Sequence, residues 1–346
     1  MSYQPPYQLT NTLLSVVAEI AELIGRWSAK NNDNLIPRLR RENRIRTIQA
    51  SLAVEQNSLT LEQVTALLNG KTVLGPPKEI QEVHNAFAAY EALPKWQTGN
   101  LEHLCKAHQL LMQGLNLEAG QFRSGGVGIF RGKELVHMAP PANQVPRLMQ
   151  QLFDWLKTTD AHTLVVSAAF HYELEFIHPF ADGNGRIGRL WQTKILSEWQ
   201  PILAYLPVET VIRSRQAEYY QCLGEADEQA DCTGFIEFML LAIKQSLEEG
   251  IEQQIGLESG LESGLELGLE SELAKEVLQL LVNEPLSRTE IARALGHKSV
   301  SSGLNRQIKW LLEHEYIEYT LPDKPNSRLQ KYRLMQIGKC VKVNNK

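Results

Sequence analysis

Apolar residues recur every three to four positions along most of this 346-residue chain. Ile45, Ile48 and Leu52 mark one such stretch. This spacing places the side chains on one face of an α-helix, which can then be buried against a core. The same pattern covers residues 80–90, 101–113, 145–157, 162–176, 186–199, 215–223 and 233–246. The chain is therefore predicted to be mainly α-helical.

Residues 120–138 break the helical pattern. They contain five glycines and two short β-like runs, Val127–Phe130 and Leu135–His137. Arg131–Lys133, between the two runs, can form the turn of a hairpin. A two-stranded hairpin is marginally stable by itself, so we expect this one to lie against the helices.

A short repeat marks a boundary near residue 250. The triplet Gly-Leu-Glu occurs four times from Gly256 onward, at a spacing of four residues. Each glycine costs about 1 kcal/mol in a helix relative to alanine, and glutamates four residues apart repel one another. The repeat is therefore predicted to be a marginal helix or a flexible linker between two domains.

The segment after the repeat has its own pattern of elements. Three helical stretches come first and two β-like runs follow, over residues 273–282, 287–295, 299–313, 316–321 and 330–334. Three helices followed by a two-stranded wing form the pattern of a winged helix-turn-helix domain.

This C-terminal segment is also basic. From Leu273 onward there are 13 Lys and Arg residues against 7 Asp and Glu, whereas the whole chain has a net charge of −5. A basic segment on an acidic body permits a polyanionic partner for that segment alone. Arg306 and Lys309, in the third helix, are its candidate nucleic-acid contacts.

The stretch from 178 to 189 reads HPFADGNGRIGR. Gly183, Asn184 and Gly185 form a turn whose residues tolerate a positive φ. An apolar helical pattern follows this turn directly. Backbone N–H groups at such a helix N-terminus are a ready site for an anion.

Charged side chains flank this glycine-rich turn. Arg186 and Arg189 lie on one side of the first helical turn, and two guanidiniums beside an anion site suit a polyphosphate. Asp182 is an oxygen ligand of the kind that holds Mg²⁺ together with substrate phosphates. His178, with an ordinary pKa of about 6.5, can accept a proton at neutral pH. The stretch predicts a phosphoryl or nucleotidyl transfer site; a polar turn between core helices would explain only the glycines.

Residues 178–189 match, at every fixed position, the signature of the Fic family, His-Pro-Phe-x-Asp/Glu-Gly-Asn-Gly-Arg-x-x-Arg. Residues 120–149 resemble the flap hairpin of the family and the helix after it. Tyr219 and Tyr220 resemble the paired aromatic residues that line its adenine pocket, and His137 is a candidate to face the nucleotide. The resemblance implies a mainly α fold, with a Fic helical bundle, a β-hairpin flap and a C-terminal winged helix-turn-helix domain.

The resemblance also suggests how the chain is divided. Residues 1–95 are expected to form an N-terminal helical region with an inhibitory motif, and residues 96–250 the Fic catalytic domain. The Gly-Leu-Glu linker would cover 251–272 and the winged helix-turn-helix domain 273–346.

The activity that the resemblance implies is protein adenylyltransfer, in which AMP moves from ATP to a Ser, Thr or Tyr hydroxyl and pyrophosphate is released. His178 would be the general base, and Asp182 would bind Mg²⁺ between the α- and β-phosphates. Gly183, Asn184 and Gly185 would hold these phosphates through backbone and amide groups. Arg186 would neutralise the β-phosphate and Arg189 the γ-phosphate, while Phe180 would anchor the loop by packing.

A second motif concerns regulation. Ser51–Glu55 resembles the inhibitory sequence of the family, Ser/Thr-x-x-x-Glu followed by Gly or Asn, although Gln56 takes that last position here. Glu55 closes a predicted helix, where a carboxylate opposes the helix dipole and should seek a cation. The resemblance implies that Glu55 pairs with Arg189 at the ATP site and blocks the γ-phosphate. An exposed surface glutamate is the alternative.

Two other functions fit the same residues. The first is a DNA-binding regulator that uses its Fic body as a nucleotide sensor, although a sensor has no need of the base His178. The second is removal of AMP, in which Glu55 would activate water. Asp227 stands near where related sequences often carry an asparagine that touches the nucleotide, so its charge could alter nucleotide preference.

Composition predicts the compartment. The four cysteines form no CxxC pair and are expected to be reduced thiols. The N-terminus lacks the features of a secretory signal, and the longest apolar stretch, Phe235–Ile243, is too short to span a bilayer. We expect a cytoplasmic protein without a membrane partner that acts on a protein hydroxyl, its own or another's, and forms a homodimer by default.

Overall fold

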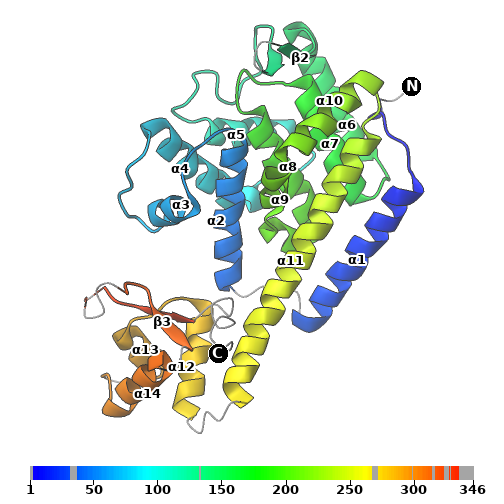
Figure 1. The fold of residues 1–346 in the computed structure, drawn as a ribbon. Helices are drawn as coiled ribbons and strands as arrows, with labels where there is room; N and C mark the ends of the chain where they lie inside the picture. Colours follow the sequence, from blue (N-terminus) through cyan, green and yellow to red (C-terminus); the bar gives the residue numbers. More distant parts are fainter. Residues whose placement is uncertain are drawn as a thin grey trace. The chain divides into compact units, whose positions relative to one another are not determined.

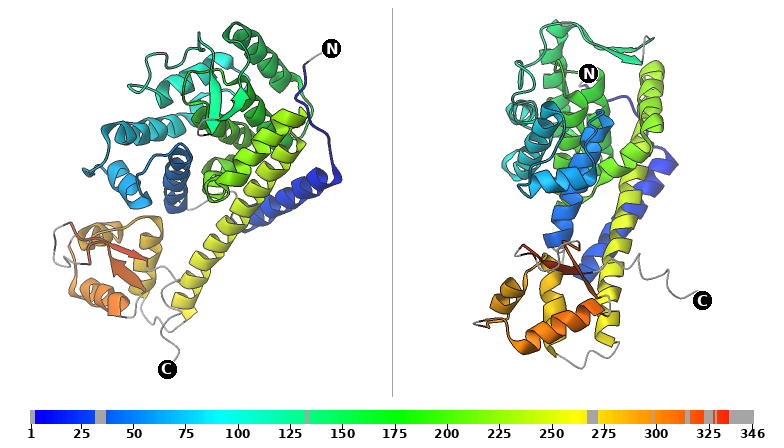
Figure 2. Two further views of the ribbon diagram at one scale, coloured as in Figure 1. Left: turned by 45° about the horizontal axis from the view of Figure 1, so that its top comes forward. Right: turned by 60° about the vertical axis from the view of Figure 1, so that its left-hand side comes forward.

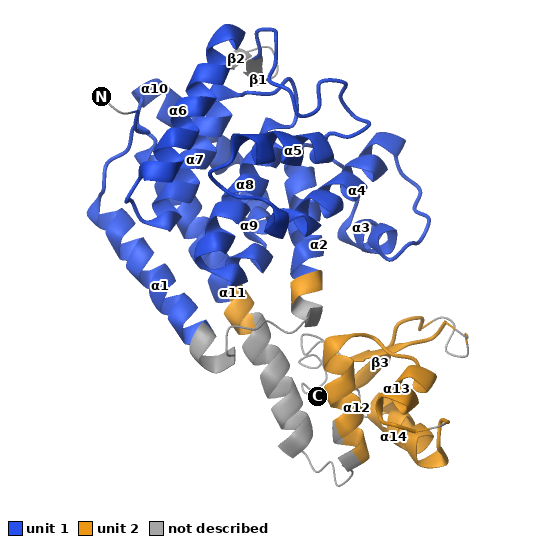
Figure 3. Ribbon diagram, turned by 180° about the vertical axis from the view of Figure 1, so that it is seen from behind, with its two compact units in different colours: residues 1–34, 42–248 blue, residues 35–41, 249–346 orange. Residues whose placement is uncertain are grey.

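The computed structural model describes residues 3–31, 37–131, 134–266, 272–297, 299–313, 316–322, 327 and 329–334. Contacts divide the chain into two compact units, residues 1–34 with 42–248 and residues 35–41 with 249–346 (Figure 3). Most of the described residues are helical, which confirms the predicted fold class. Among these residues, no helix combines the length and the apolar character needed to cross a membrane.

Most helices of the chain lie wholly in the first unit, and α2 and α11 lie partly in it. In chain order these elements, with the short 3-10 helices η1 to η3, are α1 (Asn11–Asn31), α2 (Pro37–Val54), α3 (Leu61–Leu68), α4 (Pro77–Glu91), η1 (Leu93–Lys95), α5 (Leu101–Leu111), η2 (Ala142–Gln144), α6 (Val145–Thr158), α7 (Thr163–Ile177), α8 (Asn184–Trp199), η3 (Pro201–Tyr205), α9 (Val208–Ser214), α10 (Gln216–Gln229) and α11 (Thr233–Glu266).

The core of this unit is built around α7 and α8. Every residue of α7 from Leu164 to Glu175 is buried, as expected for a helix that other elements surround on all sides. α8 packs against α7, α5 and η3, and Trp191 on α8 is fully buried. The loop that joins α7 to α8 is therefore held between the two most buried helices of the unit (Figure 1).

Local sequence signals explain where several helices begin. Thr60 and Gln63 form a capping box at the start of α3, with Thr60 N–H donating to Gln63 Oε1 at 2.9 Å. Pro77 opens α4 at its first position. The side chain of Asn100 accepts from the backbone N–H of Glu102 and caps α5.

A two-stranded hairpin interrupts the helices. β1 (Gly128–Arg131) pairs antiparallel with β2 (Glu134–Met138), with a register shift between Ile129 and Phe130. The hairpin lies beside α10 rather than standing alone (Figure 2). Of its predicted turn, residues 132 and 133 lie outside the described part of the chain.

The long helix α11 runs beside α1 (Figure 1). Lys244 Nζ lies 2.6 Å from Glu19 Oε2, and Thr10 Oγ1 donates to Glu237 Oε1 at 2.7 Å. α11 continues to Glu266, so most of the Gly-Leu-Glu repeat is helical. Of the two alternatives predicted there, a helix is present up to Glu266; residues 267–271 lie outside the described ranges.

The second unit has the element order predicted for it. α12 (Glu272–Asn283), α13 (Arg288–Ala294) and α14 (Ser302–Glu313) precede an antiparallel pair, β3 (Ile317–Tyr319) and β4 (Tyr332–Leu334). These elements enclose a core of their own, whose fully buried members include Leu281, Ile291, Leu304, Ile308 and Leu311.

Candidate active site

The loop from His178 to Gly183 joins α7 to α8, and the residues of the predicted signature lie on this loop and on the first turns of α8. His178, directly after the end of α7, has a left-handed backbone with a φ of +50°, and Gly183, with a φ of +84°, precedes the first turn of α8. A Cβ at Gly183 would lie 2.7 Å from Met112 Sδ. Glycine is therefore required here both for its backbone conformation and for space.

Asn184 braces this loop from within. It is buried, its Nδ2 donates to the carbonyl of Phe180 at 2.8 Å, and its Oδ1 accepts from the N–H of Phe180 at 2.9 Å. The sequence led us to expect the amide of Asn184 on the phosphates. The structure instead engages both ends of that amide in the loop, so the backbone N–H groups are what the turn offers to an anion.

His108, on α5, supports the same loop through a hydrogen bond and a ring contact. Its Nδ1 accepts from the N–H of Gly120 at 2.9 Å, so Nε2 carries the proton and donates to the carbonyl of Asp182 at 2.8 Å. Its ring stacks on that of the buried Phe180, with centroids 3.6 Å apart. Burial lowers the pKa of His108 to about 4, so the ring is neutral at physiological pH.

Arg123 ties the loop to the segment before the hairpin. This side chain is 3% exposed. Its Nε donates to the carbonyl of His178 at 2.7 Å, and its two Nη atoms donate to the carbonyls of Gly125, Pro140 and Ile177. Arg123 thus fixes the strained backbone of His178, a role that no local sequence pattern indicated.

The contacts of His178 favour one tautomer. Nδ1 lies 3.3 Å from the backbone carbonyl of Glu175, which can only accept a hydrogen bond. Nδ1 is therefore the protonated nitrogen, and Nε2 keeps the lone pair that a general base needs. His178 is partly exposed.

Asp182 and Arg186 form an ion pair across the first turn of α8. Asp182 Oδ1 lies 2.9 Å from Arg186 Nη2 and also accepts from the N–H of Gly183 at 2.6 Å. Asp182 is half-exposed, and its Oδ2 has no hydrogen-bond partner among the described residues. A carboxylate with one oxygen available suits a cation that is held mainly by substrate phosphates.

Arg189 points toward α2 and meets both residues of the second motif. Its side chain is 1% exposed; Nη2 lies 2.7 Å from Glu55 Oε1, and Nε lies 3.0 Å from Ser51 Oγ. Burial alone would lower the pKa of Arg189, but the charge and hydrogen bond of Glu55, together with Tyr219 and Glu175, outweigh it, and the pKa stands above its usual range. The pairing of Glu55 with Arg189 expected from the sequence is present.

Glu55 also covers the turn at the start of α8. A Cβ at Gly185 would collide with Glu55 Oε1. The carboxylate therefore lies directly against the backbone that the sequence assigned to phosphates. α2 ends in a turn in which Gln56 has a φ of +68°, a conformation that explains why Gly or Asn suits this position.

The paired tyrosines differ in their surroundings. Tyr219 is 1% exposed, and its hydroxyl lies 3.0 Å from His171 Nε2, whereas Tyr220 is 38% exposed. The Tyr219 ring packs against Phe235 and Phe238, so Tyr220 is the more open of the two rings, and the lining of an adenine pocket by this pair stays a prediction. Asp227 accepts from the hydroxyl of Tyr172 at 2.9 Å. The side chain of His137 lies outside the described part of the structure.

The candidate nucleic-acid contacts belong to the other unit. Arg306 and Lys309 are both exposed on α14, one turn apart. Lys309 Nζ lies 3.5 Å from Glu313 Oε1, a surface pair that contributes little stability.

Comparisons with known proteins agree with this geometry. Residues 98–196 match the Fic/DOC family, and residues 272–335 match the C-terminal domain of Fic-like proteins (filamentation induced by cAMP). The chain is 29% identical over 213 residues to the protein adenylyltransferase Fic of Nematostella vectensis, covering 58% of this chain and 47% of that protein. That of Drosophila willistoni is 26% identical over 228 residues, 62% of this chain and 43% of its own. The chain thus spans less than half the length of these curated relatives.

Solved structures extend the match to nearly the whole chain. The crystal structure of a Fic family protein from Desulfovibrio desulfuricans G20 is 53% identical, with a TM-score of 0.73, and covers 96% of this chain and 98% of that one. Fic-1 from C. elegans, 23% identical with a TM-score of 0.56, covers 70% of this chain and 71% of its own and shares the fold. On this match and on the signature at 178–189, the chain belongs to the Fic family.

Proposed function

We propose that this chain is a protein adenylyltransferase, which moves AMP from ATP to a Ser, Thr or Tyr hydroxyl of a protein and releases pyrophosphate. The observation that carries the proposal is the loop between α7 and α8. There a base with Nε2 as acceptor precedes a helix N-terminus flanked by two buried arginines. The curated relatives are protein adenylyltransferases by name, which supports the same reaction.

The residues divide the chemistry among them. His178 Nε2 takes the proton of the acceptor hydroxyl as its oxygen attacks the α-phosphorus. A new oxygen–phosphorus bond forms, and the bond from the α-phosphorus to the bridging oxygen breaks, so that pyrophosphate leaves with the electron pair. The backbone N–H groups of the loop and the dipole of α8 stabilise charge on the phosphates. Arg186 and Arg189 neutralise charge on the leaving pyrophosphate.

Mg²⁺ is the cofactor that this site suits. Asp182 would hold it through Oδ2, the oxygen without a hydrogen-bond partner among the described residues. Bound Mg²⁺ would neutralise charge on the α- and β-phosphates. Asp182 also accepts from Arg186, so engaging the carboxylate elsewhere would release Nη2 of that arginine toward the nucleotide.

Inhibition of the resting protein by Glu55 is part of the proposal. Glu55 Oε1 occupies the space over Gly185 and pairs with Arg189, which supports its role as a substitute for a phosphate of the nucleotide. Removing this carboxylate would free both the arginine and the anion site at α8.

The test is the intact mass of the protein after incubation with Mg-ATP. Glu55→Gly should gain AMP on its own chain, wild type should gain little, and Glu55→Gly with His178→Ala should gain none. Labelled ATP in a cell lysate extends the test to other acceptors. If neither the Glu55→Gly chain nor any lysate protein acquires AMP, adenylyltransfer is excluded.

Two secondary proposals each rest on one observation. Glu55 is one-third exposed within the site, which favours removal of AMP by activation of water; wild type would then strip AMP from the self-modified Glu55→Gly protein. Arg306 and Lys309 are exposed on α14, which favours contact with DNA by the second unit.

A further inference from the structure

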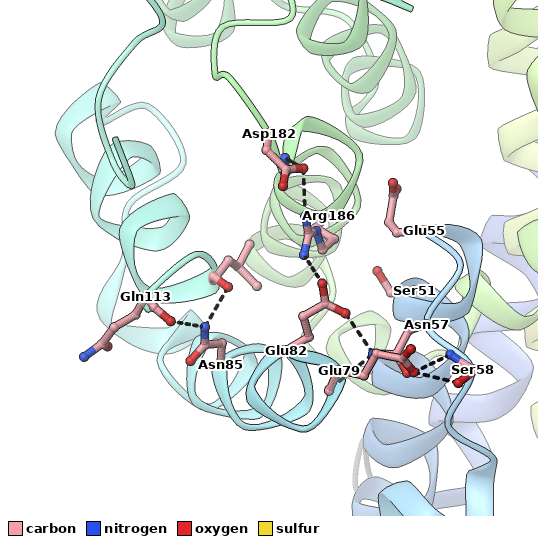
Figure 4. Close-up of polar contacts among 12 residues, drawn as sticks. Ser51, Glu55, Asn57, Ser58, Glu79, Glu82, Asn85, Gln113, Asp182 and Arg186 are labelled. Atoms are coloured by element: carbon pink, nitrogen blue, oxygen red, sulfur yellow. Dashed lines mark hydrogen bonds and ion pairs between the residues drawn. The ribbon is translucent and has the colours of Figure 1, made fainter. Parts of the chain in front are cut away.

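Arg186 has a second carboxylate partner, which the family signature does not contain. Glu82, on α4, lies with Oε1 3.2 Å from Arg186 Nη1, while Asp182 Oδ1 lies 2.9 Å from Nη2 (Figure 4). The side chain of Glu82 is 9% exposed and that of Asp182 is 51% exposed. Water screens a buried pair least, so Glu82 holds the guanidinium more firmly than Asp182 does.

The other oxygen of Glu82 contacts the turn after α2. Glu82 Oε2 accepts from Asn57 Nδ2 at 2.8 Å. The orientation of Asn57 is fixed, because its Oδ1 accepts from the N–H of Leu59 at 3.1 Å and its Nδ2 also donates to the carbonyl of Glu79. Glu82 therefore faces a donor on each side, and a carboxylate accepts from both, whereas an amide can accept from one only.

The same turn reaches both arginines of the signature. Glu55 contacts Arg189 directly, and Asn57, two residues later, contacts Arg186 through Glu82. The N–H of Asn57 donates to the carbonyl of Leu52 at 3.1 Å, which closes the turn. Figure 4 shows Asn57 from the turn after α2, Glu82 from α4 and Arg186 from α8 joined by these polar contacts.

α4 presents Glu82 from a fixed position. Asn85, three residues further along this helix, donates through Nδ2 to the carbonyl of Leu111 at 3.0 Å and to that of Gln113 at 2.8 Å. These bonds attach α4 to the end of α5. A side chain held on an anchored helix can fix another residue to within a fraction of an ångström.

We propose that Glu82 is a positioning residue that holds Arg186 ready for the β-phosphate of the nucleotide. This inference rests on the proposed function, in which Arg186 neutralises that phosphate. When a nucleotide and its cation engage Asp182, Nη2 is released while Nη1 stays on Glu82. Arg186 then meets the phosphate without losing further side-chain freedom, which is the advantage of a preorganised site. Arg186 Nε, which has no hydrogen-bond partner among the described residues, is a further donor.

The test compares two nucleotides that differ in the β-phosphate. Calorimetry would measure binding of Mg-ADP and of AMP to the Glu55→Gly protein, with and without Glu82→Gln. Glu82→Gln should weaken Mg-ADP about tenfold, the order expected for a lost hydrogen bond to a charged group, and should leave AMP affinity unchanged. A role in folding alone would change both affinities or neither.

A paired variant tests the contact with Asn57. Asn57→Asp alone sets two carboxylates against each other and should also weaken Mg-ADP. Combined with Glu82→Gln, the new carboxylate accepts from the amide of residue 82, whose oxygen faces Arg186 again. The double variant should therefore bind Mg-ADP more tightly than either single variant.

Arg186→Gln separates the failure of this inference from the failure of the proposed function. If Arg186→Gln leaves Mg-ADP binding intact, the assignment of Arg186 to a phosphate is wrong. If Arg186→Gln weakens Mg-ADP but Glu82→Gln does not, or if the double variant shows no recovery, Glu82 is not a positioning residue. Thermal melting shows whether each variant is folded. If Glu82→Gln does not fold, Glu82→Asp replaces it in the same comparison, because the side chain of aspartate is too short to reach Arg186.

Discussion

Gln56 stands at a backbone position that suits glycine or asparagine better. A left-handed conformation costs a residue other than glycine about 1–2 kcal/mol. Gln56→Gly removes that cost. It also raises the conformational entropy of the unfolded chain, which lowers stability by about 0.5–1 kcal/mol. We expect a net gain of up to about 1 kcal/mol in the free energy of unfolding in urea, together with less modification of the chain by Mg-ATP, since the turn holds Glu55 more firmly.

The matched control is the same substitution in an ordinary helix. Gln221 is exposed on α10, where glycine costs about 1 kcal/mol. Gln221→Gly should therefore lower stability. If both variants lower it equally, the left-handed turn at Gln56 carries no cost.

The buried ring of His108 makes stability depend on pH. Burial lowers its pKa to about 4 in the folded protein, whereas the unfolded value is about 6.5. Between these values the unfolded chain binds more protons, so stability falls as the pH drops below about 6.5, by roughly 2 kcal/mol at pH 5. Urea unfolding across this range measures the free energy of unfolding of both proteins. The excess of wild type over His108→Gln should shrink by that amount between about pH 6.5 and pH 5.

Other groups titrate in the same window, so a difference between variants is needed. Burial and the charge of Asp227 raise the pKa of Glu173 to about 7, which acts in the opposite direction. The exposed Gln221 carries no titrating group, so Gln221→Gly should leave the pH dependence as in wild type. Parallel curves for wild type and His108→Gln would contradict the assignment.

At the scale of elements, Arg123 connects the hairpin segment to the catalytic loop. Arg123→Met would leave carbonyls on both sides of the junction without their donor, at about 1–3 kcal/mol for each buried group. We expect a loss of about 3 kcal/mol in the free energy of unfolding. AMP transfer by the Glu55→Gly protein should be lost, because His178 is no longer fixed.

Arg147→Met provides the comparison. Arg147 is exposed on α6, where it contacts two glutamines, and its loss should change stability by less than about 0.5 kcal/mol. Arg123→Lys should behave like Arg123→Met, since an ammonium cannot span the carbonyls that the guanidinium reaches. A stable, active Arg123→Lys protein would exclude this role of Arg123 in fixing the loop at His178.

Sequence periodicity predicts the helices and the hairpin better than it predicts the side chains that hold them in place. The capping box of α3, the proline that opens α4 and the hairpin follow from local rules, and all are present. α1 is predicted only as part of a helical region over residues 1–95, although its buried Leu13, Val16, Ile20 and Ile24 recur at the helical spacing that defines such an element.

The candidate site divides in the same way. His178 to Arg189 are adjacent in sequence, so their chemistry is visible without a fold. Arg123, His108 and Glu82 reach the site through contacts with residues 55, 74 and 104 positions away. Each looks like an ordinary helix or loop residue by itself, so only the packed structure reveals what it does.

At the scale of the whole molecule, two units with separate cores should respond separately to damage. Leu190 on α8 and Leu281 on α12 are both fully buried. Leu→Ala at such a site costs about 2–5 kcal/mol. In calorimetry we expect two transitions, with Leu190→Ala lowering one midpoint and Leu281→Ala the other. A single transition lowered by both would show that the chain unfolds as one body.

Contact of the second unit with DNA would show in its dependence on salt. Each phosphate neutralised contributes a slope of about −0.9 in log K against log[salt]. The double variant Arg306→Gln, Lys309→Gln should have a slope that is smaller in magnitude by roughly 2. Fluorescence anisotropy with duplex DNA at several salt concentrations measures it. Arg333, already bound to Glu318 at 2.7 Å, serves as the control through Arg333→Gln. Binding that is equal in all three proteins would remove α14 from any contact with DNA.

The contact between Glu55 and Arg189 joins residues 134 positions apart, and the carboxylate comes first in the chain. During translation α2 therefore leaves the ribosome before α7 and α8 exist. The carboxylate is already present when the loop at 178–189 emerges and folds. On the proposed inhibition, a newly made chain never passes through a stage in which the site is complete and Glu55 has yet to be synthesised, so the cell is protected from this activity from the moment the site can form.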